Sequence, residues 1–149
     1  MNWIELQARC TPLLATFFFA ASALWMGTLF SVSWLSGRAK MMADGPEIGS
    51  LAVSLYRRWA TPSMLVSMGA GVGWLAEAPS EGLRAHWVYG IVAAVLALVG
   101  LHNAVGGRAR RVGRGSLNAT RGEGVRRLAL LVSFGAIVAL ASLRGSLLP

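Results

Sequence analysis

Two histidines are the side chains best suited to hold a metal-bearing group. His102 follows an apolar run, where a neutral imidazole can ligate haem iron or the magnesium of a chlorophyll. The alternative is an interfacial histidine that hydrogen-bonds water, a lipid headgroup or a carbonyl. His86 lies sixteen residues earlier. That spacing is roughly 24 Å along one helix, so the two cannot ligate the same iron. A bis-histidine site would need a second chain.

Two neighbouring arginines offer another kind of chemistry. Arg57 and Arg58 immediately precede an apolar segment, where guanidinium groups can clamp haem propionates or another carboxylate. As topology anchors they would instead hold the helix end at the membrane surface. Trp25 and the aromatic run 17–19 can pack on a tetrapyrrole face, although an aromatic core or lipid contact is the more ordinary use. With His102, these residues form a candidate site for haem b or another tetrapyrrole.

The elements that must position these side chains are apolar helices. The apolar run 87–101 is followed by a track of seven arginines, and a membrane-spanning helix with a cytoplasmic end has this pattern. Only 13% of the chain is charged, against about 25% in soluble domains. The net charge of +8 does not indicate nucleic acid, because the arginines flank runs of membrane length. We interpret them as topology anchors that contact anionic lipid headgroups. They are Arg108, Arg110, Arg111, Arg114, Arg121, Arg126 and Arg127.

The apolar runs predict four membrane spans in a single domain over residues 1–149. The spans cover about 13–36, 60–76, 87–105 and 128–143, each close to the ~20 residues that cross a bilayer. Residues 47–59 show apolar residues at helical spacing and predict an amphipathic extension before the second span. Pro62 predicts a kink near the start of that span. We therefore expect an all-α, integral membrane four-helix bundle.

The distribution of charge predicts the orientation of these spans. The segments 37–58 and 106–127 hold four and seven of the fourteen Lys and Arg residues, so both are expected on the cytoplasmic side. The second segment is expected to be a basic loop, and both termini then face outside. The first apolar run is longer than a signal-peptide core. We expect a retained helix in a bacterial inner membrane. Most tryptophans fall near predicted interfaces, but Trp25 lies mid-membrane.

Small residues four apart predict how the helices associate, because close backbone approach replaces the hydrophobic effect in lipid. One row on the first helix is Ala23, Gly27 and Ser31, and one on the second is Ser63, Ser67 and Gly71. Such rows support a bundle, and they equally suit a surface for another subunit.

Several function classes are disfavoured by what the sequence lacks. The predicted hydrocarbon segments contain no Asp, Glu, Lys or Arg, and proton pumps and ion carriers usually keep such groups at depth. No Walker, zinc-type or Ser-His-Asp pattern is present. Cys10 is the sole cysteine, which excludes an intrachain disulfide.

Three stretches resemble the HemJ and CopD-like family of small membrane proteins. The first helix contains 21-ASALWMGTL-29, the second opens 55-LYRRWATPSM-64, and the third ends with Gly100-Leu101-His102 before an arginine-rich segment. The likeness covers about residues 15–145. It implies a four-helix scaffold and, in HemJ, a haem b enzyme that oxidises protoporphyrinogen IX to protoporphyrin IX. Where the family has its helix-one histidine this chain has Phe18, and the family's His-x-Lys falls on Tyr89 and Ile91.

These observations lead to three hypotheses. The first is a degenerate family member that is a non-catalytic accessory subunit of a larger redox or photosynthetic membrane complex, in contact with lipids and other membrane subunits. The second is a protoporphyrinogen oxidase-like enzyme with single-ligand haem on His102 and propionates on Arg57 and Arg58. The third, based on the arginine track alone, is a basic protein that docks at the membrane surface.

Overall fold

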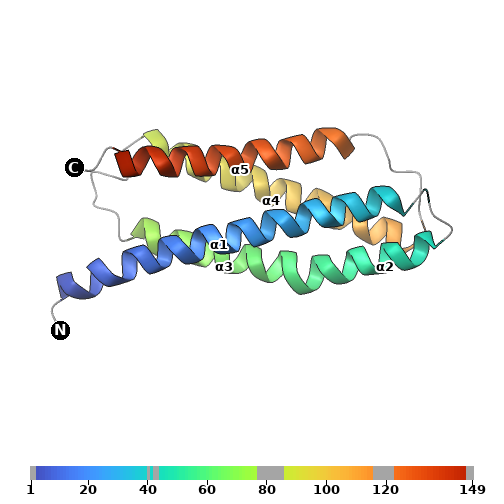
Figure 1. Cartoon of the computed structure of the whole chain (residues 1–149), viewed down its shortest axis with the longest axis horizontal. Helices are drawn as coiled ribbons and strands as arrows, with labels where there is room; N and C mark the ends of the chain where they lie inside the picture. Colours follow the sequence, from blue (N-terminus) through green and yellow to red (C-terminus); the bar gives the residue numbers. More distant parts are fainter. Residues whose placement is uncertain (1–2, 40, 42–43, 77–85, 116–122, 147–149) are drawn as a thin grey trace.

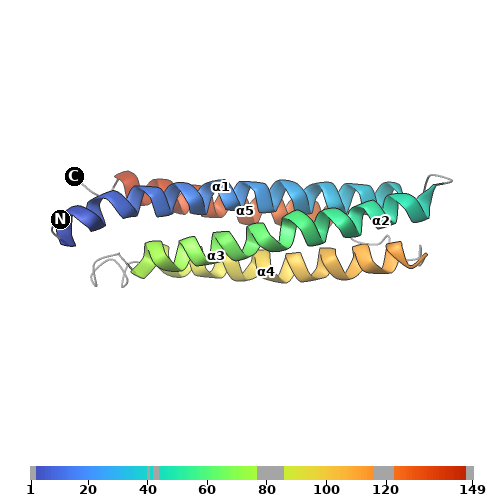
Figure 2. The same cartoon turned by 90° about the horizontal axis from the view of Figure 1, so that it is seen from below.

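A computed structural model describes residues 3–39, 41, 44–76, 86–115 and 123–146. Apart from turns at 39, 41, 44 and 114–115, the chain is helical in these ranges. The elements are α1 (Trp3–Arg38), α2 (Gly45–Leu55), a π-helical turn η1 (Tyr56–Ala60), α3 (Thr61–Ala76), α4 (His86–Gly113) and α5 (Glu123–Ser146). Since α2, η1 and α3 form one continuous rod, four long rods lie side by side (Figures 1 and 2). The predicted all-α architecture is confirmed.

Two helices are long and apolar enough to cross a membrane by length and composition. These segments are Pro12–Arg38 in α1 and Val88–Gly113 in α4, while Arg127–Ala139 is a shorter apolar segment of α5. The first two correspond to the first and third predicted spans, and the shorter segment to part of the fourth; among the described residues, the second predicted span, 60–76, is not one of these segments. The predicted extension 47–59 is helical, and it continues into α3 without a break.

The prediction of a loop at 106–127 is wrong for residues 106–113, which are helical. Helix α4 continues to Gly113, so Arg108, Arg110 and Arg111 lie on it, and Arg114 follows in a turn. Positive charge ends a membrane span, but it does not end a helix, because arginine is a good helix former. Arg126 and Arg127 lie within α5. Arg121 lies outside the described residues, as does the side chain of Arg126.

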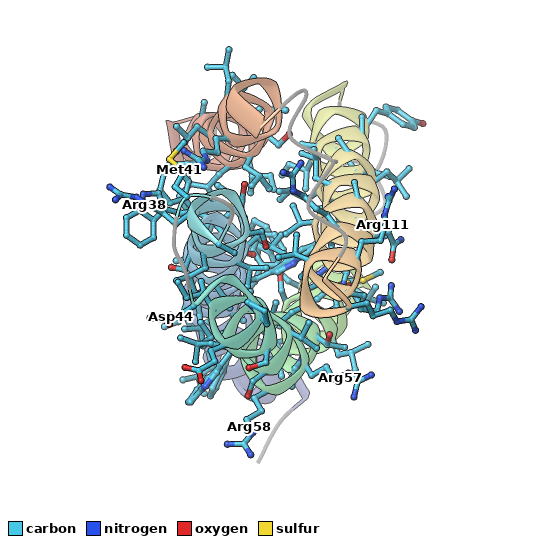
Figure 3. All side chains as sticks on the ribbon, turned by 90° about the vertical axis from the view of Figure 1, so that its right-hand side faces the viewer. Arg38, Met41, Asp44, Arg57, Arg58 and Arg111 are labelled. Atoms are coloured by element: carbon cyan, nitrogen blue, oxygen red, sulfur yellow. The ribbon has the colours of Figure 1, made fainter. Side chains whose placement is uncertain are left out.

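The ends of four elements meet at one end of the bundle, which we call the basic end. It extends from the last turns of α1 and α4 and the first turns of α2 and α5 inward to η1, opposite the two chain termini (Figure 1). Its exposed arginines are Arg38, Arg57, Arg58, Arg110, Arg111 and Arg114. Figure 3 looks onto this end, where Arg38 lies on the side away from Arg57 and Arg111.

Helix α1 is the central rod, since it contacts α2, η1, α3, α4 and α5. Its buried residues Trp25, Leu29 and Val32 enter a core shared with Leu98 of α4 and Leu130 of α5. At the basic end α2 packs on α4 so closely that a Cβ on Gly49 would lie 3.1 Å from Gly113. Farther from that end, α3 packs on α1 and has little or no contact with α4.

The predicted rows of small residues divide into two groups. Ser63, Ser67 and Gly71 on α3 are buried, and the second and third of these face α1. By contrast, Ala23 and Gly27 of α1 are exposed. Ser31 follows on the same exposed face. This α1 stripe (Ala23, Gly27 and Ser31) is thus not used for packing within the described bundle.

Candidate functional site

His102 lies in the interior, not at a lipid-facing surface. Its side chain is only 3% exposed, and it is held between α1 and η1. Trp25 Nε1 lies 3.2 Å from His102 Nδ1, and Tyr56 Oη lies 2.8 Å from His102 Nε2. The Tyr56 and His102 rings stack with their centroids 4.7 Å apart. The cluster of Trp25, Tyr56 and His102 thus connects three elements at one level of the bundle.

The indole of Trp25 determines the tautomer of this imidazole. An indole N–H only donates hydrogen bonds, so His102 Nδ1 must accept one and carry no proton. A neutral imidazole then has its proton on Nε2, which donates to Tyr56 Oη. Tyr56 therefore cannot donate its own proton to His102 in this arrangement, because Nε2 has no vacant lone pair. The cluster therefore joins α1, η1 and α4 through two hydrogen bonds.

Burial at the basic end also affects Tyr56, which precedes the predicted second span. Desolvation raises the pKa of its hydroxyl, while the positive charge of Arg110 lowers that pKa. The hydroxyl is therefore protonated at neutral pH and can accept the bond from His102. The guanidinium of Arg110 lies beside this contact, since its Nε donates to the carbonyl of Gly106, against which the Tyr56 ring packs.

The π-helical turn has a cause in the sequence. Pro62 lacks an N–H, and in an α-helix its ring would clash with the carbonyl of Arg58 four residues earlier. The chain widens just before this point, with the N–H of Thr61 bonded to the carbonyl of Tyr56. The Thr61 hydroxyl also donates to that carbonyl. Such single π turns replace the regular ladder where it is interrupted and often occur at functional sites.

Gly106 permits Tyr56 to lie against α4. A Cβ at this position would fall onto the Tyr56 ring and its hydroxyl. A Cβ on the neighbouring Gly107 would meet no atom within 4 Å. Gly106 is therefore required for packing, and nothing in the composition of this stretch distinguished it from its neighbour.

The arginines assigned to the candidate site do not join His102 in one pocket. Arg57 and Arg58 are exposed, and Figure 3 shows them pointing away from the bundle. The prediction that Arg108 contacts lipid headgroups is wrong, because its side chain is only 2% exposed. It occupies the buried face of α4 together with Val105 and Val112, which are spaced at one helical turn. Arg127 is half-buried.

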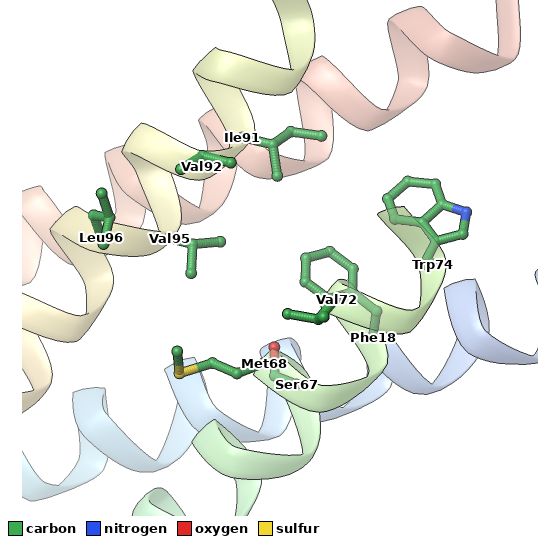
Figure 4. A pocket seen from close by; sticks show the side chains of 10 residues that line it. Phe18, Ser67, Met68, Val72, Trp74, Ile91, Val92, Val95 and Leu96 are labelled. Atoms are coloured by element: carbon green, nitrogen blue, oxygen red, sulfur yellow. The ribbon is translucent and has the colours of Figure 1, made fainter. Parts of the chain in front are cut away.

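A separate apolar groove lies where α3 and α4 diverge. This α3–α4 groove has a volume of about 200 Å³. Helix α1 closes it with Phe18, whose ring stacks on Trp74 at a centroid distance of 5.8 Å. Figure 4 shows the groove between the two helices. Its lining is Phe18, Ser67, Met68, Gly71, Val72, Trp74, Ile91, Val92, Val95 and Leu96.

Ser67 is the polar side chain of this lining, and it is already bonded. Its hydroxyl lies 2.7 Å from that of Ser22 on α1, and both residues are buried. The groove therefore presents hydrocarbon. Sequence reasoning missed it, although the apolar residues Val92 and Leu96 recur at helical spacing on one face of α4.

The residues present do not fit a haem group. Both nitrogens of His102 are hydrogen-bonded, so iron could bind only if Trp25 or Tyr56 turned away. The lining of the α3–α4 groove contains no histidine, cysteine or tyrosine to hold iron, its only sulfur is the Met68 thioether, and Phe18 lies there in the position of the family's histidine. Over the described part of the chain, no three His, Cys, Asp or Glu side chains come together. Tyr89, the position of the other family histidine, is exposed.

Comparison with protein families, with curated proteins and with solved structures finds no match for this chain.

Proposed function

We propose that this chain is a polytopic membrane protein that crosses a bacterial inner membrane four times. It is a non-catalytic accessory subunit of a larger membrane complex, of a redox or photosynthetic kind as the family resemblance implies. The basic end faces the cytoplasm and the termini lie outside, because positive residues are retained on the cytoplasmic side.

Exposed apolar side chains support the membrane placement. Phe17 of α1, Leu65 of α3, Leu96 of α4 and Leu131 of α5 are each between 55% and 64% exposed. Single exposed apolar residues are ordinary in soluble proteins, but apolar residues on the outside of every rod suit a lipid surrounding. Trp34 and Trp59 are exposed near the basic end, where an aromatic belt belongs.

The α1 stripe is the observation that carries the assignment to an accessory subunit. A Cβ on Gly27 would meet no atom within 4 Å, so this backbone is open to close approach by a second helix. Phe30, Ser31, Trp34 and Leu35 surround an adjoining shallow hollow of about 330 Å³. An open backbone beside large apolar side chains is the surface that membrane helices use for association.

The haem enzyme receives no such support, because its proposed iron ligand is engaged at both nitrogens. The surface-docking hypothesis is also weaker, since Arg108 and part of Arg127 are withdrawn from the surface.

Affinity purification from the native membrane in mild detergent tests the proposal. The wild-type protein should co-purify with other membrane subunits, and Gly27→Leu should reduce their recovery without changing its own thermal stability. Gly100→Leu on α4 is the matched control, because a Cβ there also meets nothing within 4 Å. Recovery of the wild type as a monomer without partners would contradict an accessory role.

A further inference from the structure

We propose that the α3–α4 groove and the arginines on the same side of the basic end bind one anionic phospholipid of the cytoplasmic leaflet. Its phosphate lies between Arg57 and Arg110, and one acyl chain ends in the groove. This inference rests on the membrane placement proposed above, and it does not depend on the α1 stripe or on a partner subunit.

The arginines on this side are arranged to meet a phosphate at the membrane surface. Arg110 Nε donates to the carbonyl of Gly106 at 3.2 Å, and Arg111 Nε donates to that of Gly107 at 3.4 Å. Both side chains therefore fold back one turn along α4, toward its apolar part. This bond uses one of the five N–H groups of each guanidinium, a group that suits phosphate oxygens.

Arg57 lies on the adjoining helix at a similar level. It follows Tyr56, whose ring packs against Gly106, and the carbonyl of Gly106 accepts the bond from Arg110. Figure 3 shows Arg57 and Arg111 on the same side of the basic end, with Arg38 on the other side. Two helices thus contribute positive charge to one edge of the bundle, which complements an anionic headgroup.

The spacing along α4 connects this charge to the groove. Leu96, Asn103 and Arg110 are separated by seven residues each, so they share one face of the helix. The folded-back guanidinium of Arg110 lies at the level of Gly106, and the rise from Gly106 to Val92 is about 21 Å. Half of the hydrocarbon core is about 15 Å thick, and the headgroup region adds about 5–7 Å. A phosphate at Arg110 therefore places the end of its acyl chain at the level of Val92, within the groove.

The shape of the groove favours an acyl chain over a partner helix. The rim residues Met68, Val72, Val92 and Leu96 are exposed and apolar. One turn of a helix, about 10 Å across with its side chains and 5.4 Å high, occupies about 400 Å³, more than the groove's volume of about 200 Å³. A single file of methylene groups fits between the two helices and leaves no polar group without a partner, since Ser67 is bonded to Ser22.

The test is native mass spectrometry of the delipidated, detergent-solubilised protein, titrated with dipalmitoyl phosphatidylglycerol or phosphatidylcholine. We expect a one-to-one complex with phosphatidylglycerol and much weaker binding of phosphatidylcholine. Arg57→Gln and Arg110→Gln should each weaken the complex about fivefold, the contribution of one basic residue at an anionic surface. Arg38→Gln removes the same charge on the other side and should leave the affinity unchanged.

Two further measurements test the acyl-chain half of the site. Val92→Phe fills the groove and should weaken phosphatidylglycerol binding, whereas Val132→Phe, at an exposed position of α5, should not. Glycerol 3-phosphate carries the phosphate without the chains and should fail to displace the lipid. Melting temperatures establish that each variant folds.

Equal binding of both lipids would overturn the inference, as would displacement by glycerol 3-phosphate or wild-type affinity in the arginine or Val92 variants. Alkaline carbonate extraction separates this failure from that of the proposed function. If carbonate releases the chain from membranes, the membrane placement fails. If the chain is retained and the lipid results are negative, only the lipid site fails.

Discussion

Replacing Trp25 with phenylalanine tests the hydrogen bonds that join α1, α4 and η1 in the cluster of Trp25, His102 and Tyr56. The change keeps an aromatic ring beside α4 but removes the N–H that donates to His102 Nδ1 at 3.2 Å. The imidazole nitrogen is then a buried acceptor without its donor, a loss of about 1–3 kcal/mol in protein interiors. Hydrogen bonds between membrane helices average nearer 0.6 kcal/mol. We therefore expect a loss of about 1 kcal/mol from the hydrogen bond.

The assay is thermal unfolding in detergent of the wild type, Trp25→Phe, His102→Leu and the double variant. A loss of about 1 kcal/mol lowers the melting temperature by about 2–4 °C in a chain of this size. The double-mutant cycle removes the effect of the smaller ring, because that term occurs in both arms. The coupling energy should be about 0.5–1.5 kcal/mol, within the range found between membrane helices.

Nitrogen NMR of labelled histidine gives an independent measurement. In the wild type, His102 should be the neutral tautomer with its proton on Nε2, and Trp25→Phe should allow the other tautomer to appear. A coupling energy near zero, or a wild-type imidazole protonated on Nδ1, would refute the assignment of donor and acceptor in this cluster.

Three other predictions follow from the site. Gly106→Ala should lower stability by about 1–3 kcal/mol because its Cβ meets the Tyr56 ring, whereas Gly107→Ala should be nearly neutral; equal melting temperatures for the two variants would contradict this packing. Ser22→Ala should cost about 1 kcal/mol through the lost bond to Ser67, and no change in melting temperature would show that this bond is unimportant. When haem b is added to the protein, we expect no Soret band that depends on His102, since both ring nitrogens are hydrogen-bonded. A band that is present in the wild type and lost in His102→Ala would instead support the haem enzyme.

The helices were predictable from the sequence because apolar composition and helical spacing act locally. The runs 13–36 and 87–105 lie within α1 and α4, and the extension 47–59 is helical. The helix ends were predicted less well. Charge predicts where a span ends, but a helix can continue past that point, as α4 does to Gly113.

The site was predictable only in part, because it depends on contacts between segments distant in the chain. His102 was found from its residue type, but its partners lie 77 and 46 residues away, on α1 and η1. The predicted mid-membrane position of Trp25 was the available signal, since a buried indole N–H needs an acceptor. Pro62 predicted a disturbance of the helix, but not that a π turn would orient Tyr56. The burial of Arg108 was not predicted, because the sequence placed this residue in a loop, where helical periodicity assigns no buried face.

The central claim is a membrane bundle whose basic end faces the cytoplasm, and cysteine labelling in intact cells tests it most directly. The native Cys10 should react with a membrane-impermeant maleimide from outside. In a Cys10→Ser background, Met41→Cys introduces a thiol at a position that is 85% exposed at the basic end. This thiol should react only after the inner membrane is permeabilised. Labelling of Met41→Cys from outside in intact cells, or recovery of the chain in the soluble fraction, would contradict the account.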